Sequence, residues 1–249
     1  MHVLRSLFIL VFSLMFTTFA QADTGLDELL DRHIHAIGGA NALAAVKTLQ
    51  MDLRITEGAS VLTGNYATDR QGRMRIDIFA GDKAVWTEAL DGDSAWCQQG
   101  AAAKPVTEAA EAAIALKHGV LLPGKILSLR EVTAHGVKLS IHNRERLDGI
   151  SYYVLRLDFP DGFSNYLYVH PDSYLIERQR DFRAMHPDLS LKEKRLETRF
   201  GDYRPTGGVL RSYSEQTYNL DTGQLEQSMI VIAIRINQPL AANFFSMPR

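Results

Sequence analysis

The chain has 249 residues and an almost balanced charge, because 27 Lys and Arg face 29 Asp and Glu for a formal net charge of −2. This balance excludes nucleic acid as an expected partner, since proteins that bind it present a strongly basic surface. The single cysteine, Cys97, excludes an internal disulfide, and its place beside Trp96 in an expected strand favours a buried, inert thiol.

Residues 1–22 have the pattern of a secretory signal peptide. Arg5 supplies the positive start, Leu7–Phe16 is an almost unbroken apolar run, and Ala20-Gln21-Ala22 offers small residues for cleavage. The run is short for a helix that crosses a bilayer, which favours cleavage over a membrane anchor. No cysteine follows it, so no lipid attachment is expected there. We therefore expect residues 23–249 to form a single soluble domain outside the cytoplasm.

The expected mature chain opens with a helix. Thr24 and Asp27 resemble a capping box, and the Gly38-Gly39 pair is typical of a helix end. The apolar positions between them follow helical spacing: Leu26, Leu29, Leu30, Ile34 and Ile37. Asn41 predicts the cap of a second short turn over residues 42–46.

From residue 49 the apolar pattern changes to a period of two, which predicts strands. The first strand alternates Leu49, Met51, Leu53 and Ile55 with polar residues, and a later one places Met74, Ile76 and Ile78 on one face. Further strands are expected over residues 61–68, 83–90 and 94–98. Short Gly- and Asp-containing turns separate them, as in hairpins.

A helical insertion interrupts the strands. Thr107–His118 is rich in alanine and predicts a helix that ends at Gly119. The apolar segment Val120–Leu127 follows, and Pro123-Gly124 prevents it from continuing as a regular helix. Two interpretations stay open for this segment: a connection packed on the core, or a lid over an apolar cavity.

Strands resume between residues 136 and 236, with turn residues at regular spacing, and predict an antiparallel barrel or sandwich. Two of them, Phe163–His170 and Met229–Ile236, carry apolar residues on both faces. An antiparallel sheet normally leaves one face wet. These two strands are therefore expected to be covered on both sides.

The sequence carries no catalytic signature, so no catalytic residue, metal site or cofactor is predicted. His33 and His35 are two positions apart on a helix, where they point in different directions, and one is expected to be exposed. Glu193, Arg195, Glu197 and Arg199 share one face of an expected strand. A charge ladder on a wet face explains them better than a catalytic pair of carboxylates.

The order of elements resembles the bacterial outer-membrane lipoprotein-sorting proteins, the LolA/LolB-like superfamily, in its poorly characterised periplasmic branch. The resemblance rests on the helix end Ala36-Ile37-Gly38-Gly39, the short turn Ala42–Val46, the strand meander with its helical insertion, and the ending Phe245-Ser246-Met247-Pro248. It covers nearly the whole expected mature chain. It implies an unclosed antiparallel β-barrel whose helices cover a concave apolar face that holds acyl chains.

The leading hypothesis is a non-enzymatic periplasmic carrier or binder of a lipid or of lipoprotein acyl chains, in contact at times with a membrane. Hydrophobic burial would drive binding, at roughly 25 cal/mol per Å² of apolar surface. The candidate lining residues are Leu49, Met51, Leu53, Ile55, Met74, Ile76, Ile78, Leu121, Leu122, Ile126 and Leu127.

Two alternatives remain. One is a sensor or accessory module that binds an envelope protein on the same fold. The other is an enzyme acting on a lipid or envelope polymer, which would need acids or histidines gathered inside the cavity.

Overall fold

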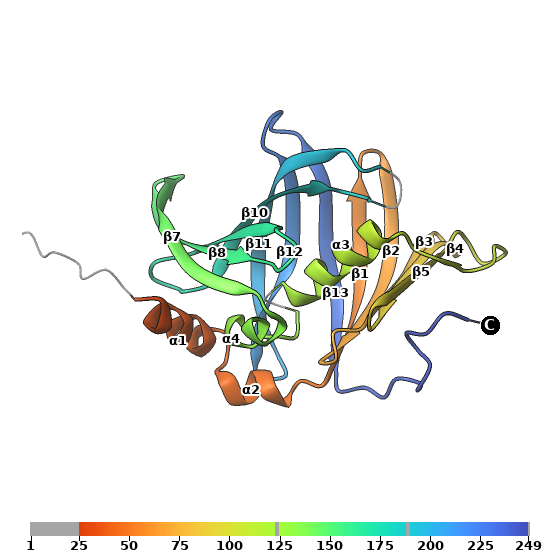
Figure 1. Ribbon diagram of the computed structural model, residues 1–249, viewed down its shortest axis with the longest axis horizontal. Coiled ribbons are helices and arrows are strands. Elements are labelled where there is room, and N and C mark those ends of the chain that lie inside the picture. Colours follow the sequence, from red (N-terminus) through yellow and green to blue (C-terminus); the bar gives the residue numbers. More distant parts are fainter. Residues whose placement is uncertain (1–24, 123–124, 188–189, 249) are drawn as a thin grey trace, which may run out of the picture.

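The computed structural model describes residues 25–122, 125–187 and 190–248, so the predicted signal peptide and its cleavage site lie outside the described residues. The described chain forms one antiparallel sheet with a few short helices on it (Figure 1). The strands are β1 (Thr48–Glu57), β2 (Ser60–Asp69), β3 (Met74–Ala80), β4 (Lys83–Asp91), β5 (Ser94–Gln98), β6 (Val106–Thr107), β7 (Lys138–Leu147), β8 (Ile150–Asp158), β9 (Ser164–Val169), β10 (Ile176–Ala184), β11 (Glu193–Thr206), β12 (Val209–Asn219) and β13 (Leu225–Ile236). The helices are α1 (Leu26–Ala36), α2 (Ala40–Ala45), α3 (Ala110–Leu121) and α4 (Leu129–Val132), followed by the 3₁₀ turn η1 (Thr133–His135).

The sheet consists of two meanders that meet in its middle. Its spatial order is β6-β5-β4-β3-β2-β1-β13-β12-β11-β10-β9-β8-β7, so the first strand pairs with the last. Figure 1 shows the sheet curling, with β7 and β5 at opposite sides. The two edge strands β6 and β7 are not neighbours in this order. The expected unclosed antiparallel barrel is therefore confirmed, and the chain is neither a closed barrel nor a sandwich.

A bulge decides which side chains of β13 face inward. The β1–β13 register shifts between Asp52 and Leu53, so Leu53 opposes Val231 whereas Met51 opposes Ile234. The prediction that Met229–Ile236 is covered on both faces is wrong. The shift puts Ile232 on the outside, where it is 54% exposed, because one extra residue reverses the alternation along a strand.

The concave face carries two apolar clusters, each covered by different helices. Under α3, residues of β1–β4 pack against Ala113, Leu116 and Val120. Under α1, α2 and α4, the side chains of β8 and β9 form the second cluster, which includes Leu155 and Leu167. Figure 1 shows α3 crossing the sheet near β13 and β1, with the other helices toward β7.

Several helix ends differ from the sequence expectations. α3 begins at Ala110 and passes through Gly119 to Leu121, because helical packing on the sheet outweighs the weak helix propensity of one glycine. Gly25 occupies the N-cap of α1 without a side-chain cap, and Thr24 lies outside the described residues. α2 begins at Ala40 with Gly39 as its N-cap, two residues before the predicted turn.

The turn between α1 and α2 depends on Gly38. Its φ of +118° suits glycine, and a Cβ there would lie 2.1 Å from the carbonyl oxygen of Gly208. The backbone N–H of Leu210 donates to the carbonyl of Ile37 at 2.9 Å. The helix end is thereby joined to the β11–β12 hairpin.

Arg70 joins three parts of the fold at the end of β2. Its guanidinium donates to the carbonyl oxygens of Leu43, Val46 and Ile126 and pairs with Glu131. Glu131 in turn closes a capping box with Ser128 that begins α4, a short helix that the sequence analysis did not predict. One side chain thus ties β2 to α2 and to the segment before α4.

The C-terminal segment packs on the convex face of the sheet although it has no regular structure. Phe245 is 2% exposed, and its carbonyl accepts from the indole N–H of Trp96 at 2.8 Å. The guanidinium of Arg73 lies 4.9 Å from the Phe245 ring centroid. This segment therefore shields β5, where Cys97 is buried as predicted.

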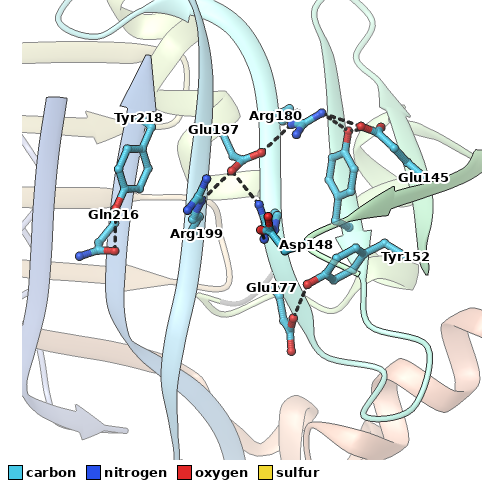
Figure 2. Close-up of polar contacts among 11 residues, drawn as sticks. Glu145, Asp148, Tyr152, Glu177, Arg180, Glu197, Arg199, Gln216 and Tyr218 are labelled. Atoms are coloured by element: carbon cyan, nitrogen blue, oxygen red, sulfur yellow. Dashed lines mark hydrogen bonds and ion pairs between the residues drawn. The ribbon is translucent and has the colours of Figure 1, made fainter. Parts of the chain in front are cut away.

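The predicted charge ladder on a wet face is confirmed in part, because Glu193, Arg195 and Arg199 are exposed whereas Glu197 is buried in a network of ion pairs (Figure 2). The side chain of Glu197 is 1% exposed and accepts from Arg178 at 3.1 Å, Arg180 at 2.7 Å and Arg199 at 2.7 Å. Tyrosines lie beneath these arginines, with Arg180 4.8 Å from the centroid of Tyr168. For Glu197 alone the expectation of solvent exposure is wrong, because neighbouring strands supply enough guanidinium and aromatic groups to cover its carboxylate.

Candidate functional site

A pocket of about 1320 Å³ lies on the concave face, with walls from α3, the 125–127 segment and the inner faces of β10–β12. Small-molecule pockets commonly measure about 300–1,000 Å³, so this space suits a long or bulky ligand. The two apolar clusters described above meet along its inner wall, where Leu49 belongs to one and Val209 to the other.

The candidate lining residues from the sequence divide into two groups. Those on the pocket wall are Leu49, Met51, Leu122, Ile126 and Leu127. Those packed elsewhere are Leu53, Ile55, Met74, Ile76, Ile78 and Leu121. The second group, apart from Leu121, lies under α3, which fills that half of the concave face with side chains. Alternation along a strand predicts which residues share a face. It does not predict which of them a helix will cover.

The described part of the Val120–Leu127 segment packs on the core and also contributes to the pocket wall. Val120, Ile126 and Leu127 are buried in the core, while Leu122, Ile126 and Leu127 also line the pocket. Residues 123–124 lie outside the described residues. The segment is thus a packed connection whose inner side forms part of the wall.

The opposite wall is polar, which the sequence analysis did not anticipate. Asp181 accepts at Oδ2 from Asn165 at 3.2 Å, from Gln179 at 3.1 Å and from Arg183 at 3.2 Å. The hydroxyls of Thr198 and Thr217 lie 3.0 Å apart on the neighbouring strands. The pocket therefore has an apolar side and a hydrogen-bonding side.

Two cations lie at the inner end of the pocket. Arg211 of β12 is 4% exposed, and its Nη1 donates to the backbone carbonyl of Lys125. Lys125 Nζ lies 4.9 Å from the centroid of the Tyr66 ring. Burial lowers the pKa of Arg211 to about 10, an effect that Tyr213 partly opposes. Burial raises the pKa of Glu215, which also lines the pocket, and Lys125 opposes this change.

His118 and Asp161 form the other titratable pair on the wall, with 2.8 Å between Nε2 and Oδ2. The His118 ring stacks on Phe163 at 4.2 Å between centroids and meets Phe159 edge-on at 4.6 Å. Burial lowers the pKa of His118, and Asp161 opposes this change. The pair connects α3 to the β8–β9 turn, and its enclosure by aromatic rings favours a structural role.

Large apolar side chains are exposed around the pocket opening. Ile114 is 40% exposed, Phe182 54%, Leu191 64% and Leu220 37%, and all four line the pocket. They come from α3, β10, the segment before β11, and the β12–β13 turn. The opening thus carries several exposed apolar side chains.

Metal ligation finds no support among the described residues, which contain no group of three or more His, Cys, Asp or Glu suited to an ion. His33 is buried, and its Nδ1 lies 2.8 Å from the carbonyl oxygen of Tyr174, whereas His35 is exposed. Burial lowers the pKa of His33. Within the same described ranges, no helix is long and apolar enough to span a bilayer.

A signal for the polar wall was present in the sequence. β10 and β12 carry polar residues at successive positions, for example Gln179, Arg180 and Asp181. A strand with one face on an apolar core should alternate instead. Polar residues on both faces of a strand inside an otherwise apolar sheet therefore indicate a wetted or ligand-facing wall.

Neither a protein-family model nor a curated protein sequence matches the chain. Its fold is similar to that of solved structures at low sequence identity. A LolA superfamily protein from Nitrosomonas europaea matches with a TM-score of 0.57 and 10% identity, covering 90% of this chain and 98% of that one. A DUF1329 family protein from Desulfovibrio piger matches with a TM-score of 0.59 and 14% identity, again covering 90% of this chain and 98% of that one. A putative outer membrane lipoprotein-sorting protein domain from Vibrio parahaemolyticus matches with a TM-score of 0.55 and 11% identity, covering 89% of this chain and 96% of that one. The chain therefore has a LolA-like fold.

Proposed function

We propose that this chain is a periplasmic carrier or binder of an amphiphilic ligand, either a lipid or the acyl chains of a lipoprotein. The observation that carries the proposal is the pocket of about 1320 Å³ on the concave face, with Leu49, Met51 and Ile126 on its apolar side. Burying an acyl chain against such a wall contributes about 0.8 kcal/mol per CH₂. The polar side offers partners to a headgroup.

The LolA-like fold and the exposed apolar opening support this proposal. Structures with this fold include a putative outer membrane lipoprotein-sorting domain. Phe182 and Leu191 at the opening suit brief contact with a membrane or with an envelope protein that delivers or accepts the ligand.

The test measures ligand occupancy directly. The chain is expressed with residues 1–22, purified from the periplasmic fraction and examined by native mass spectrometry and lipid extraction. We expect an N-terminus near Asp23 and a bound amphiphile, or uptake of a fluorescent fatty acid after delipidation. A delipidated, folded protein that takes up no acyl ligand would refute the carrier function.

Two matched substitutions locate the binding to the pocket. Met51 and Met74 are both 6% exposed and belong to the same apolar cluster, but Met51 lines the pocket and Met74 does not. Met51→Trp should reduce uptake at least tenfold, whereas Met74→Trp should not. Ala115→Trp, on the partly exposed pocket side of α3, provides a second blocking variant if overpacking prevents folding.

A further inference from the structure

The sheet leaves one long edge strand without a second neighbour. β7, which has 10 residues, ends the strand order, and Figure 1 shows it at one side of the sheet with no strand beyond it. In the part of the chain that the structure describes, the backbone of β7 forms no hydrogen bond outside its ladder with β8. The edge at the other end of the sheet is β6, which has only 2 residues. Backbone N–H and C=O groups of β7 therefore point away from the sheet and are available to a further strand.

The face of β7 that turns toward the concave side has two chemically different halves. Leu139 and Ile141 are partly buried and pack against the apolar cluster under α1, α2 and α4. The β7–β8 register shifts just after Ile141. Beyond the shift Arg144 and Arg146 alternate onto this face, and the Arg144 guanidinium lies 3.9 Å from the ring centroid of the buried Tyr153. A strand added to this edge would therefore meet an apolar half and a cationic half.

The cationic half of β7 is not neutralised within the chain. Arg144 and Arg146 are exposed and form no ion pair with any residue that the structure describes. The acids of β7, β8 and the turn between them already have arginine partners, in the pairs Glu145–Arg180, Asp148–Arg178 and Asp158–Arg156. The acids of α1 are likewise paired with Arg32 and Arg130. The free edge thus presents positive charge beside its unpaired backbone.

A second copy of the chain is a poor occupant of this edge. Aligned antiparallel over the full length of β7, it would place Arg146 opposite Leu139 and Arg144 opposite Ile141. Aligned in parallel, it would bring arginine close to arginine, which is unfavourable. A strand of another protein with acids opposite the arginines, and apolar residues opposite Leu139 and Ile141, complements both halves.

We propose that the outer edge of β7 binds an extended acidic segment of a partner protein, which adds to the sheet as a further antiparallel strand. Main-chain hydrogen bonds along β7 hold this segment, and its alternate side chains provide the selectivity. Acidic residues face Arg144 and Arg146, and apolar residues face Leu139 and Ile141. No residue of β7 lines the pocket among the described residues, so this docking surface is separate from the ligand site.

The test titrates capped peptides of the length of β7 into the purified chain by calorimetry. The acidic peptide has glutamate at alternate positions of its first half, valine at alternate positions of its second half, and threonine elsewhere. One control has the same composition in reversed order, and the other has lysine in place of glutamate. We expect the acidic peptide to bind at least tenfold tighter than either control and to slow amide hydrogen exchange in β7. No binding, or equal binding of the acidic peptide and either control, would overturn the inference.

N-methylated peptides separate strand pairing from simple charge attraction. Methylation of the backbone nitrogens that point toward β7 should abolish binding of the acidic peptide, because it removes the donors of the ladder. Methylation of the alternate nitrogens, which point away from β7, should leave the affinity within a factor of about three. Equal affinity of the two methylated peptides would show attraction without strand pairing and would overturn the inference.

Charge reversal assigns the binding to this edge. Arg146→Glu should weaken binding of the acidic peptide at least tenfold and strengthen binding of the lysine peptide. Arg54→Glu is the matched control and should change neither affinity, because Arg54 is also exposed but lies on β1, whose two edges pair with β2 and β13. An affinity that Arg146→Glu leaves unchanged would overturn the inference. A dimer of the unmodified chain that protects β7 from hydrogen exchange would overturn it in favour of a second copy.

Discussion

Removing the buried carboxylate of Glu197 should destabilise the fold by about 3 kcal/mol. Glu197→Ala leaves three guanidinium groups without their shared partner, and breaking a buried ion pair from one side typically costs about 3–5 kcal/mol. The lower end of this energy range applies because the side chain of Arg199 is 45% exposed. In addition, Arg178 keeps Asp148 as a partner and Arg180 keeps Glu145.

The pH dependence of this loss has a definite sign. Burial alone would raise the pKa of Glu197, but the hydrogen bonds and charges of Arg199, Arg180 and Arg178 outweigh it and hold the pKa below its usual range. A carboxylate with a lowered folded-state pKa stabilises the protein above its unfolded pKa, about 4.3. The stabilisation is lost as the pH falls through the lower folded-state value.

Urea unfolding followed by tryptophan fluorescence measures both effects. At pH 7 we expect the free energy of unfolding of Glu197→Ala to lie about 3 kcal/mol below that of the unmodified chain, with a difference that shrinks below about pH 4. Glu193→Ala, an exposed acid on the same strand, should stay within about 0.5 kcal/mol. A loss under about 1 kcal/mol, or one that does not begin to shrink as the pH falls below about 4, would contradict the proposed energetics.

Three further substitutions test how the elements are joined. Gly38→Ala should destabilise by more than about 3 kcal/mol in urea unfolding, because its Cβ would overlap the Gly208 carbonyl at a positive φ; a loss below about 1 kcal/mol would refute the close approach. Arg70→Met should lower the melting temperature by several degrees and accelerate hydrogen exchange in α2 and α4, since the carbonyl oxygens of Leu43 and Val46 and the carboxylate of Glu131 lose a shared donor; exchange at the rate of the unmodified chain would contradict this. Phe245→Ala should cost about 3–5 kcal/mol and shift Trp96 fluorescence toward the red, as expected for a buried aromatic side chain; an unchanged spectrum would show that the C-terminal segment does not cover β5.

The individual strands were predictable because alternation is a local property. Leu49, Met51, Leu53 and Ile55 are all buried on one face of β1, as their spacing predicts. The first helix and the Gly38-Gly39 end were predictable for the same reason, since caps and glycine turns depend on neighbouring residues. The sequence predicted that one of His33 and His35 would be exposed, because they point in different directions on a helix, and the structure shows that it is His35.

The candidate site was only partly predictable. Alternation placed Met51 and Met74 on the concave face. It did not show that α3 covers Met74 and leaves Met51 on the pocket wall. The inward turn of Ile234 and the exposure of Ile232 depend on a bulge in the pairing with β1, far away in the sequence. Such pairings join residues that are far apart in the sequence, so a short stretch of sequence does not predict them.

The sequence by itself determined the antiparallel meander and its helical insertion, because periodicity, turn residues and glycine stops act over a few residues. The tertiary structure decided how these pieces shape a pocket. The pairing of β1 with β13 brings the two meanders together, and the packing of α3 fills half of the concave face. The same packing places Arg211 and Lys125 together although they are distant in the chain. Charge burial depends on what surrounds a side chain in space, so the burial of Arg211 became apparent only in the folded molecule.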